Sequence, residues 1–379
     1  MESGTESLQI NILHVLTLNG RNGEYGGPVR VARELCQELN SRGHKTHIFS
    51  GALVGSEPKP SCKLSESFIH VKPITQRLKV SSLWSWKLIP PLKNLIRNAD
   101  IIHIHFARDL IPFLAAFLAI ILRKPFITQT HGMIIFDGRI STRVTDLFLT
   151  RPLLNKSRLN LVLTDYEASA VEKIRMKSLT TKLPNGIAMP LKLPNPDNLQ
   201  KRIVFCSRLD KRKGLGKFIN LAQEFKDLNL KFEVYGPDGG ELQFLKSEIE
   251  NRGIANILEY KGSLPSDQVQ VMLSGIDLLV LPSKDEPFPM VVLEALSVGT
   301  SVLVMPSCGF AYELKKFDTN FVAIGEEVEG LIQIFQFYVD SDFIFRSRDE
   351  VRDFCTNTFG ISNVTDKLND LYKQVLSYE

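Results

Sequence analysis

Short apolar runs alternate with stretches of helical periodicity along the first half of the chain. Residues 10–16 form an apolar, β-branched run that predicts a strand, and residues 29–42 place apolar side chains on one helical face. Four more strands are predicted in this half, with helices between them, at residues 45–49, 101–105, 126–130 and 159–164. This alternation indicates an α/β architecture with a doubly wound parallel sheet.

A segment rich in Pro and Asn, residues 184–200, interrupts the pattern and is interpreted as a linker between domains. A second alternation follows, with strands predicted at residues 202–207, 231–235, 257–260, 278–282 and 301–305. The chain ends in an amphipathic helix, residues 361–376. We therefore predict two Rossmann-like domains, residues 1–186 and 187–358, and a terminal helical segment, residues 359–379.

Size and composition fit a globular protein with two domains. The chain has 379 residues, more than one ordinary core needs, of which 44% are apolar and 23% charged. The net charge of +4 gives no reason to expect nucleic acid as a partner. The five Cys form no C-x-x-C pair, so the sequence indicates neither a disulfide framework nor a zinc site.

Two carboxylates eight positions apart carry the clearest chemical signal. Glu286 lies in a predicted loop after a buried strand, and Glu294 lies about one turn into the helix that begins at Met290. Loops at the carboxyl ends of parallel strands are where open α/β sheets bind ligands, and carboxylates there can accept hydrogen bonds from sugar hydroxyls. Taken alone, the spacing favours a plainer interpretation, a loop acid followed by a solvated helix residue.

A basic segment follows the first predicted strand of the second half. Arg208 and Lys213 lie between that strand and the helix that begins at Gly214. Arg offers a bidentate fork to phosphate oxygens and Lys a point charge, so the pair is predicted to hold a diphosphate and to stabilise it as it leaves. A solvated basic loop is the alternative interpretation.

Together and in order, these motifs resemble those of the retaining glycosyltransferases of family 4, which have the GT-B fold. Glu286 and Glu294 match the family's E-x7-E motif, and Arg208 and Lys213 match its R-L...K-G motif. Further matches along the chain are Gly26-Gly27, His103-x-His105, His131-Gly132 and Pro184-Asn185-Gly186-Ile187. The resemblance covers nearly the whole chain. It implies two Rossmann-like domains that face each other across a cleft, with the terminal helix packed back on the first domain.

The resemblance also implies a role for each matched residue. Arg208 and Lys213 would hold the donor diphosphate, Glu294 the ribose and Glu286 the transferred sugar. His131 would contact that sugar near the reacting carbon. The other donor-binding residues that the resemblance implies are Gly26, Gly27, Gly236, Gly262, Phe288 and Met290.

The loop after Glu286 departs from the family pattern. Where the family usually has E-G-F-G, this chain has Glu286-Pro287-Phe288-Pro289. Proline has no N–H, so only Phe288 and Met290 can donate backbone hydrogen bonds from this loop.

His103 and His105 alternate on a predicted strand and therefore share one face of the sheet. Two interpretations stay open. The pair lines the acceptor site, or the two side chains are paired inside the domain.

The predicted activity is transfer of a hexose-type sugar, with retention, from a UDP- or GDP-sugar to a hydroxyl of a glycan or lipid-linked glycan acceptor. We expect this reaction to serve cell-surface polysaccharide synthesis. No cofactor and no metal are expected, since Arg208 and Lys213 take the place of a metal. The alternatives are a nucleotide-sugar epimerase of the same fold, a glycoside hydrolase and a non-catalytic sugar-binding protein. In a hydrolase, Arg208 and Lys213 would have no purpose.

A basic region at residues 58–98 has attachment to a membrane surface as one interpretation. It carries eight Lys or Arg against one acid, Glu66, and includes Trp84 and Trp86. Such a surface suits an anionic bilayer, and an ordinary basic face with buried tryptophans is the alternative. The longest apolar run, residues 110–122, is too short for a span of about 20 residues and predicts a buried helix. Because the N-terminus shows no signal-peptide pattern, we expect a cytoplasmic protein, free or peripheral on the inner face of the membrane.

Overall fold

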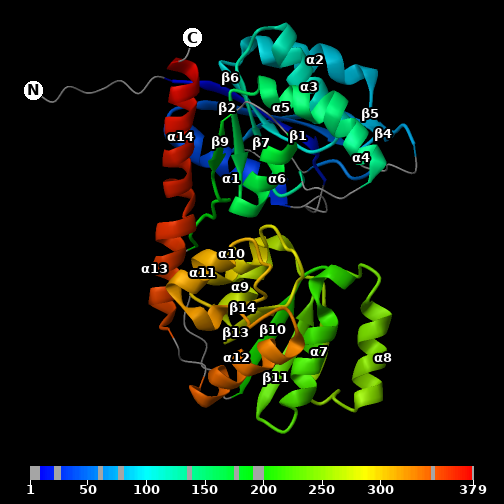
Figure 1. The fold of residues 1–379 in the computed structure, drawn as a ribbon, viewed down its shortest axis with the longest axis vertical. Coiled ribbons are helices and arrows are strands. Elements are labelled where there is room, and N and C mark those ends of the chain that lie inside the picture. Colours follow the sequence, from blue (N-terminus) through cyan, green and yellow to red (C-terminus); the bar gives the residue numbers. More distant parts are fainter. Residues whose placement is uncertain are drawn as a thin grey trace, which may run out of the picture. The chain divides into compact units, whose positions relative to one another are not determined.

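In the computed structural model the chain forms two compact units, each built on its own parallel sheet (Figure 1). Unit 1 comprises Met1–Gly186 and Ile361–Glu379, and unit 2 comprises Ile187–Gly360. The structure describes residues 9–20, 27–58, 63–75, 81–134, 139–174, 179–190, 200–342 and 346–377. Most of the predicted linker, residues 191–199, therefore lies outside the described residues.

Seven parallel strands form the sheet of unit 1, in the order β3-β2-β1-β6-β7-β8-β9. All five residues of β6 (Ile101–His105) are buried, as expected for a central strand covered on both faces. The other strands are β1 (Asn11–Leu18), β2 (Lys45–Ala52), β3 (Ser65–His70), β7 (Phe126–Gln129), β8 (Leu159–Val162) and β9 (Thr180–Lys182). A separate hairpin pairs β4 (Lys72–Pro73) with β5 (Leu83–Trp84). The five strands predicted in this half are confirmed as β1, β2, β6, β7 and β8, whereas the two edge strands, β3 and β9, were not predicted.

Helices cover both faces of this sheet. Leu13 and Val15 of β1 belong to a large core under α2 and α3, whereas Leu16 packs with Val29 and Ala32 of α1. Alternate residues of a strand face opposite sides, so α1 covers the face that also carries His14. The helical segments of unit 1 are α1 (Gly27–Ser41), η2 (Trp86–Leu88), α2 (Ile89–Asn98), α3 (Leu110–Ile121), α4 (Ile140–Thr145), η3 (Asp146–Thr150), α5 (Arg151–Lys156), α6 (Asp165–Ile174) and α14 (Ile361–Ser377).

The apolar run at residues 110–122 forms α3. Most of its side chains are buried, but Phe117 and Ile121 are exposed, so the prediction of a buried helix is only partly met. Among the residues that the structure describes, no helix is both long and apolar enough to cross a membrane.

Five parallel strands form the sheet of unit 2, in the order β12-β11-β10-β13-β14. They are β10 (Lys201–Cys206), β11 (Leu230–Tyr235), β12 (Leu258–Gly262), β13 (Leu278–Leu281) and β14 (Ser301–Val304). The helical segments are η4 (Lys211–Lys213), α7 (Leu215–Glu224), α8 (Leu242–Arg252), α9 (Ser266–Ser274), α10 (Met290–Ser297), α11 (Ala311–Phe317), η5 (Thr319–Phe321), α12 (Val328–Asp340) and α13 (Arg348–Phe359). Every strand predicted in this half is present.

The last helix, α14, belongs to unit 1 and contacts α1. Arg42, at the end of α1, donates to Asp366 Oδ1 over 2.5 Å and to the Ser362 carbonyl over 2.9 Å. Tyr372 is fully buried, and its hydroxyl lies 2.6 Å from His103 Nδ1 of β6. The terminal helix therefore reaches the central sheet of unit 1.

Candidate functional site

A cavity of about 270 Å³ lies at the carboxyl ends of β10, β11 and β13 in unit 2. This is the edge at which parallel α/β sheets bind ligands. The predicted site residues that it brings together are Arg208, Lys213, Gly236, Glu286, Met290 and Glu294. The remaining lining residues are Cys206, Ser207, Tyr235, Pro237, Leu264, Val269, Leu281, Pro289 and Val291.

Lys213 and Glu286 form an ion pair within this cavity. Lys213 Nζ lies 2.5 Å from Glu286 Oε2, and the two side chains are only 14% and 12% exposed. A backbone hydrogen bond holds the loop around Glu286, because Gly309 N donates to the Glu286 carbonyl over 2.8 Å. Asp285, next to Glu286, has a φ of 50°, a backbone conformation that non-glycine residues seldom adopt. An ammonium and a carboxylate are thus presented together, within reach of one ligand.

Two glycines let the loops of this site approach one another. Gly214 follows Lys213 with a φ of 76°, and a Cβ there would lie 2.0 Å from the Pro282 carbonyl oxygen. Gly236 has a φ of 141°, and its Cβ would lie 1.8 Å from the Ser207 carbonyl oxygen. Both positions need glycine for conformation and for space. They set the distance between the basic loop and its neighbours.

Arg208 and Glu294 lie on different elements of the cavity. Arg208 follows the end of β10 and is exposed to solvent. Glu294 is the fifth residue of α10, one turn into the helix, and is only 6% exposed. The predicted place of Glu294 on its helix is confirmed. A buried acid and an exposed cation on one cavity suit a ligand that carries both hydroxyl and phosphate groups.

Two other predicted donor residues lie next to lining residues. The Gly262 carbonyl accepts a hydrogen bond from Gly236 N over 2.9 Å. The Phe288 ring is buried and packs against Phe310 at a centroid distance of 4.7 Å, and also contacts Phe359. The Phe288 side chain thereby anchors the Glu286 loop to the core of unit 2.

In unit 1, His131 lies in a tight turn directly after β7. His131 and Gly132 have φ values of 50° and 74°, and Met133 N donates to the Thr130 carbonyl over 2.8 Å. Positive φ at both central positions is the signature of a type I′ turn, which costs free energy at a non-glycine residue. Two glycines of unit 1, Gly26 and Gly27, were predicted to bind the donor. Gly27 begins α1, and Gly26 lies outside the described residues.

A buried carboxylate that the sequence analysis missed holds this turn. Glu167 of α6 is 1% exposed and accepts hydrogen bonds from Thr130 Oγ1 (2.6 Å), Leu163 N (2.7 Å) and Gly132 N. Burial raises the pKa of Glu167, while these three donors oppose that rise. No motif marks Glu167, because its role depends on how α6 packs against the end of β7.

Four buried imidazoles lie together on the α1 side of the sheet. His105 Nδ1 lies 2.7 Å from His131 Nε2, and His105 Nε2 lies 3.1 Å from His14 Nδ1. His103 pairs separately, with Tyr372 and with Gln129 Oε1 at 3.1 Å. Burial lowers the pKa of His14 to about 3 and that of His131 to about 4, and holds the pKa values of His103 and His105 well below 6.5. His103 and His105 are therefore both paired inside the unit.

Family models match both halves of the chain. "Glycosyltransferase Family 4" matches residues 25–189, and "Glycosyl transferases group 1" matches residues 192–350. The chain is 23% identical to an uncharacterized 41.2 kDa protein in the cps region of Klebsiella pneumoniae, over 83% of this chain and 90% of that protein. It is 25% identical to a putative colanic acid biosynthesis glycosyltransferase, WcaL, of Escherichia coli, over 48% of this chain and 47% of that one.

Among solved structures, Anabaena HepE in complex with UDP has a similar fold. The TM-score is 0.74 at 16% identity, covering 97% of this chain and all of that one. The matches to curated relatives span between 31% and 90% of those proteins' own lengths.

Proposed function

Because the chain belongs to the family 4 glycosyltransferases with the GT-B fold, we propose that it transfers a sugar from a nucleoside-diphosphate sugar to a hydroxyl of a glycan or lipid-linked glycan. The observation that carries this proposal is the cavity at the carboxyl ends of β10, β11 and β13. It presents two cations, Arg208 and Lys213, together with two carboxylates, Glu286 and Glu294. A nucleoside-diphosphate sugar carries the matching groups, a dianionic diphosphate between two sets of hydroxyls.

The Lys213–Glu286 ion pair suggests how the donor is bound. A diphosphate brings negative charge that competes with Glu286 for Lys213, and the sugar hydroxyls can then donate to the Glu286 carboxylate. Arg208 supplies a fork for the other phosphate oxygens. We propose that Glu294 accepts hydrogen bonds from the ribose hydroxyls. We propose that these two cations stabilise the charge of the diphosphate, a role for which other transferases use a metal ion.

Catalysis would come from charge that grows on the diphosphate as the bond to the sugar breaks. Arg208 and Lys213 attract that charge more strongly in the transition state than in the bound donor, so they lower the barrier. We propose retention at the anomeric carbon. The bond from that carbon to the phosphate oxygen breaks, the bond to the acceptor oxygen forms on the same face, and the acceptor proton passes to the leaving phosphate.

The sugar acceptor is proposed to be part of a cell-surface polysaccharide under synthesis. The relative named for colanic acid biosynthesis supports this context. We propose that His131, in the turn that it shares with Gly132, contacts the transferred sugar.

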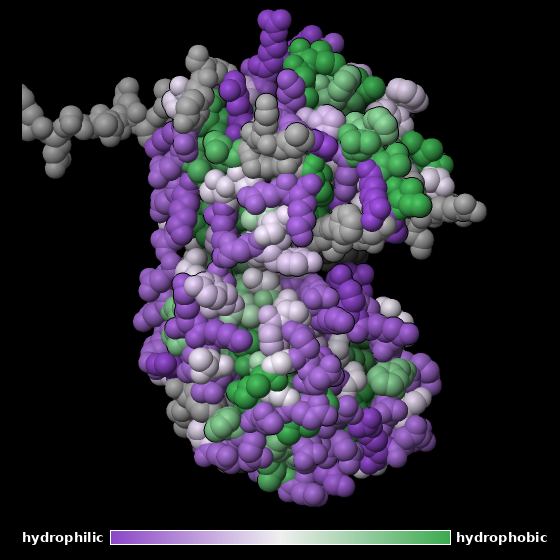
Figure 2. Space-filling view, in the orientation of Figure 1, coloured by the Kyte–Doolittle hydropathy of each residue, from purple (hydrophilic) through white to green (hydrophobic). Residues whose placement is uncertain are grey.

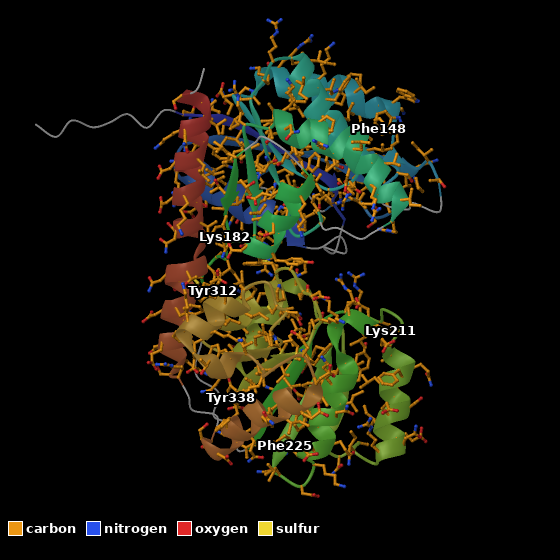
Figure 3. All side chains as sticks on the ribbon, viewed as in Figure 1. Phe148, Lys182, Lys211, Phe225, Tyr312 and Tyr338 are labelled. Atoms are coloured by element: carbon orange, nitrogen blue, oxygen red, sulfur yellow. The ribbon has the colours of Figure 1, made fainter. Side chains whose placement is uncertain are left out.

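We propose that the hairpin of β4 and β5, together with η2 that follows it, attaches unit 1 to an anionic bilayer. Trp86 and Ile74 are 75% and 66% exposed and lie close in sequence to Lys87 and Lys72. Figure 2 shows further hydrophobic residues on the surface of unit 1, and Phe148, labelled in Figure 3, is 69% exposed. Apolar side chains beside lysines suit a lipid interface. Lys59, Arg77 and Lys79 of the predicted basic region lie outside the described residues.

Vesicle sedimentation tests the membrane proposal. The protein should co-sediment with vesicles that contain phosphatidylglycerol and not with pure phosphatidylcholine, and Trp86→Ser with Lys87→Glu should release it. Equal binding of the double variant would exclude Trp86 and Lys87 as the residues that attach the protein.

A thermal-shift panel tests the donor site. UDP, GDP, ADP and their common sugars are each added to the wild type and to the variants Arg208→Ala and Lys213→Ala. One nucleotide at about 100 times its Kd should stabilise the wild type by about 2.7 kcal/mol, and both variants should lose that shift. Lys211→Ala is the matched control, because Lys211 is an exposed cation on the same loop that does not line the cavity (Figure 3).

If no nucleotide stabilises the wild type, or if both variants keep the shift, the proposed donor site is wrong. A nucleotide-sugar epimerase is separated by its products. It would release an epimerised sugar from the donor without an acceptor, whereas a transferase needs the acceptor for a new glycosidic bond. The anomeric proton coupling of the product, measured by NMR, decides between retention and inversion.

A further inference from the structure

Three imidazoles form an unbroken line from the middle of the sheet to the turn after β7. His14 Nδ1 meets His105 Nε2 at 3.1 Å, and His105 Nδ1 meets His131 Nε2 at 2.7 Å. The rings of His105 and His131 are nearly parallel, with 5° between their planes. The three side chains are 0%, 2% and 9% exposed, so water does not compete for these contacts. The line spans β1, β6 and the end of β7. Two of its members, His14 and His105, have no role in the proposed reaction.

Counting protons restricts this line to two arrangements. Each neutral imidazole has one N–H, and each N···N contact needs one proton between its two nitrogens. Either every ring carries its proton on Nδ1, so that donation runs from His14 through His105 to His131, or every ring carries it on Nε2 and donation runs the other way. A mixed arrangement would set two lone pairs or two N–H groups against each other.

The two ends of the line are equivalent. His14 Nε2 and His131 Nδ1 are both buried, and neither has a hydrogen-bond partner among the described residues. The first arrangement places its unpaired proton on His131 Nδ1, and the second places it on His14 Nε2. In both arrangements the three rings share one tautomer.

We propose that His105, backed by His14, is a positioning residue that fixes the orientation of His131 and couples its tautomer to those of His105 and His14. The His131 ring then anchors the strained turn at Thr130 to Met133. Glu167 also holds this turn, because it accepts hydrogen bonds from Thr130 Oγ1 and Gly132 N. This inference rests on the proposed function insofar as the turn supports the transferred sugar. The tautomer itself does not depend on that function.

The first measurement is independent of activity. The full-length protein is labelled with 15N in its histidine rings, and two-bond proton–nitrogen correlation spectra at pH 7.5 report the tautomer of each ring. Seven histidines make the spectrum tractable, and His14→Gln and His105→Gln assign the signals. His14, His105 and His131 should all show the same tautomer, either all protonated on Nδ1 or all protonated on Nε2. Different tautomers among the three rings, or an imidazolium in the line, would overturn the inference.

The second measurement asks whether the line matters for turnover. Release of nucleoside diphosphate from the donor that the thermal-shift panel identifies is followed for the wild type, His105→Phe and His105→Gln. His105→Phe should lower kcat about tenfold with an unchanged Kd for the nucleotide, because it takes both partners from the line and does not line the cavity proposed for the nucleotide. His105→Gln should recover part of the loss, since an amide can donate to one neighbouring imidazole and accept from the other.

Tyr372→Phe is the matched control for stability. It removes a buried hydrogen bond to His103, on the same strand, and leaves the His14–His105–His131 contacts in place. Its kcat should stay at the wild-type value. Wild-type turnover in His105→Phe, or an equal loss in Tyr372→Phe, would exclude a positioning role. If no donor is turned over at all, the proposed function fails and the NMR result still decides the tautomer.

Discussion

At the scale of single residues, the Lys213–Glu286 pair joins the residue predicted to hold the diphosphate to the residue predicted to hold the transferred sugar. Before the donor binds, each side chain neutralises the other at 2.5 Å, with little exposure to water. A buried charge that loses its partner is left with its full desolvation cost, which exceeds what the intact pair contributes. The pair should therefore matter more to stability when it is broken on one side than when both members are replaced.

Lys213→Met should lower the free energy of unfolding by about 1–3 kcal/mol, because it leaves Glu286 charged and unpaired in the cavity. Lys213→Met with Glu286→Gln should recover part of that loss, and urea denaturation of the two single variants and the double variant measures the coupling. Purely additive effects would show that the contact contributes nothing to the folded state. Glu286→Gln alone should abolish most turnover while nucleotide binding survives.

At the scale of elements, the turn between η4 and α7 should fail when Gly214 is replaced. Gly214→Ala adds a Cβ 2.0 Å from the Pro282 carbonyl oxygen, at a φ of 76°. Gly253→Ala, at the end of α8, is the matched control, because its φ is 62° and nothing lies within 4 Å of the added carbon. The control should lose about 1–2 kcal/mol from backbone conformation alone. Gly214→Ala should lose clearly more and should also weaken nucleotide binding, as it displaces Lys213; equal losses in urea denaturation would contradict this.

Features of the elements that depend on local sequence could be predicted, whereas contacts that depend on how elements pack could not. The alternation of strands and helices and the place of Glu294 on α10 depend on local periodicity, so the pattern is enough to predict them. His14 meets His105 across 91 residues only because β1 pairs with β6 in one register, which no local pattern records. Glu167 and the packing of Phe288 likewise depend on how elements pack. The cavity was predicted from its motif residues, but its apolar wall of Leu264 and Val269 was not.

At the scale of the whole molecule, acid should destabilise the two units unequally. All seven histidines of the chain lie between His14 and His131, in unit 1. His14, His103, His105 and His131 have pKa values far below 6.5 in the folded state. As pH falls below about 6.5, the unfolded chain binds protons at these sites and the folded unit does not, so stability is lost until the folded pKa values are reached. Each group contributes up to about 1.4 kcal/mol per pH unit.

Glu167, whose pKa is raised, works in the opposite direction, but it is one group against four. Both tryptophans also lie in unit 1, so their fluorescence follows the unfolding of that unit, while circular dichroism follows both. Between pH 7.5 and pH 5.5 the fluorescence transition of the full chain should move to lower temperature by more than any second transition seen by circular dichroism. A nucleotide that binds the cavity should raise only the second transition. Parallel movement of both signals with pH would show that the buried histidines do not control the acid sensitivity of this protein.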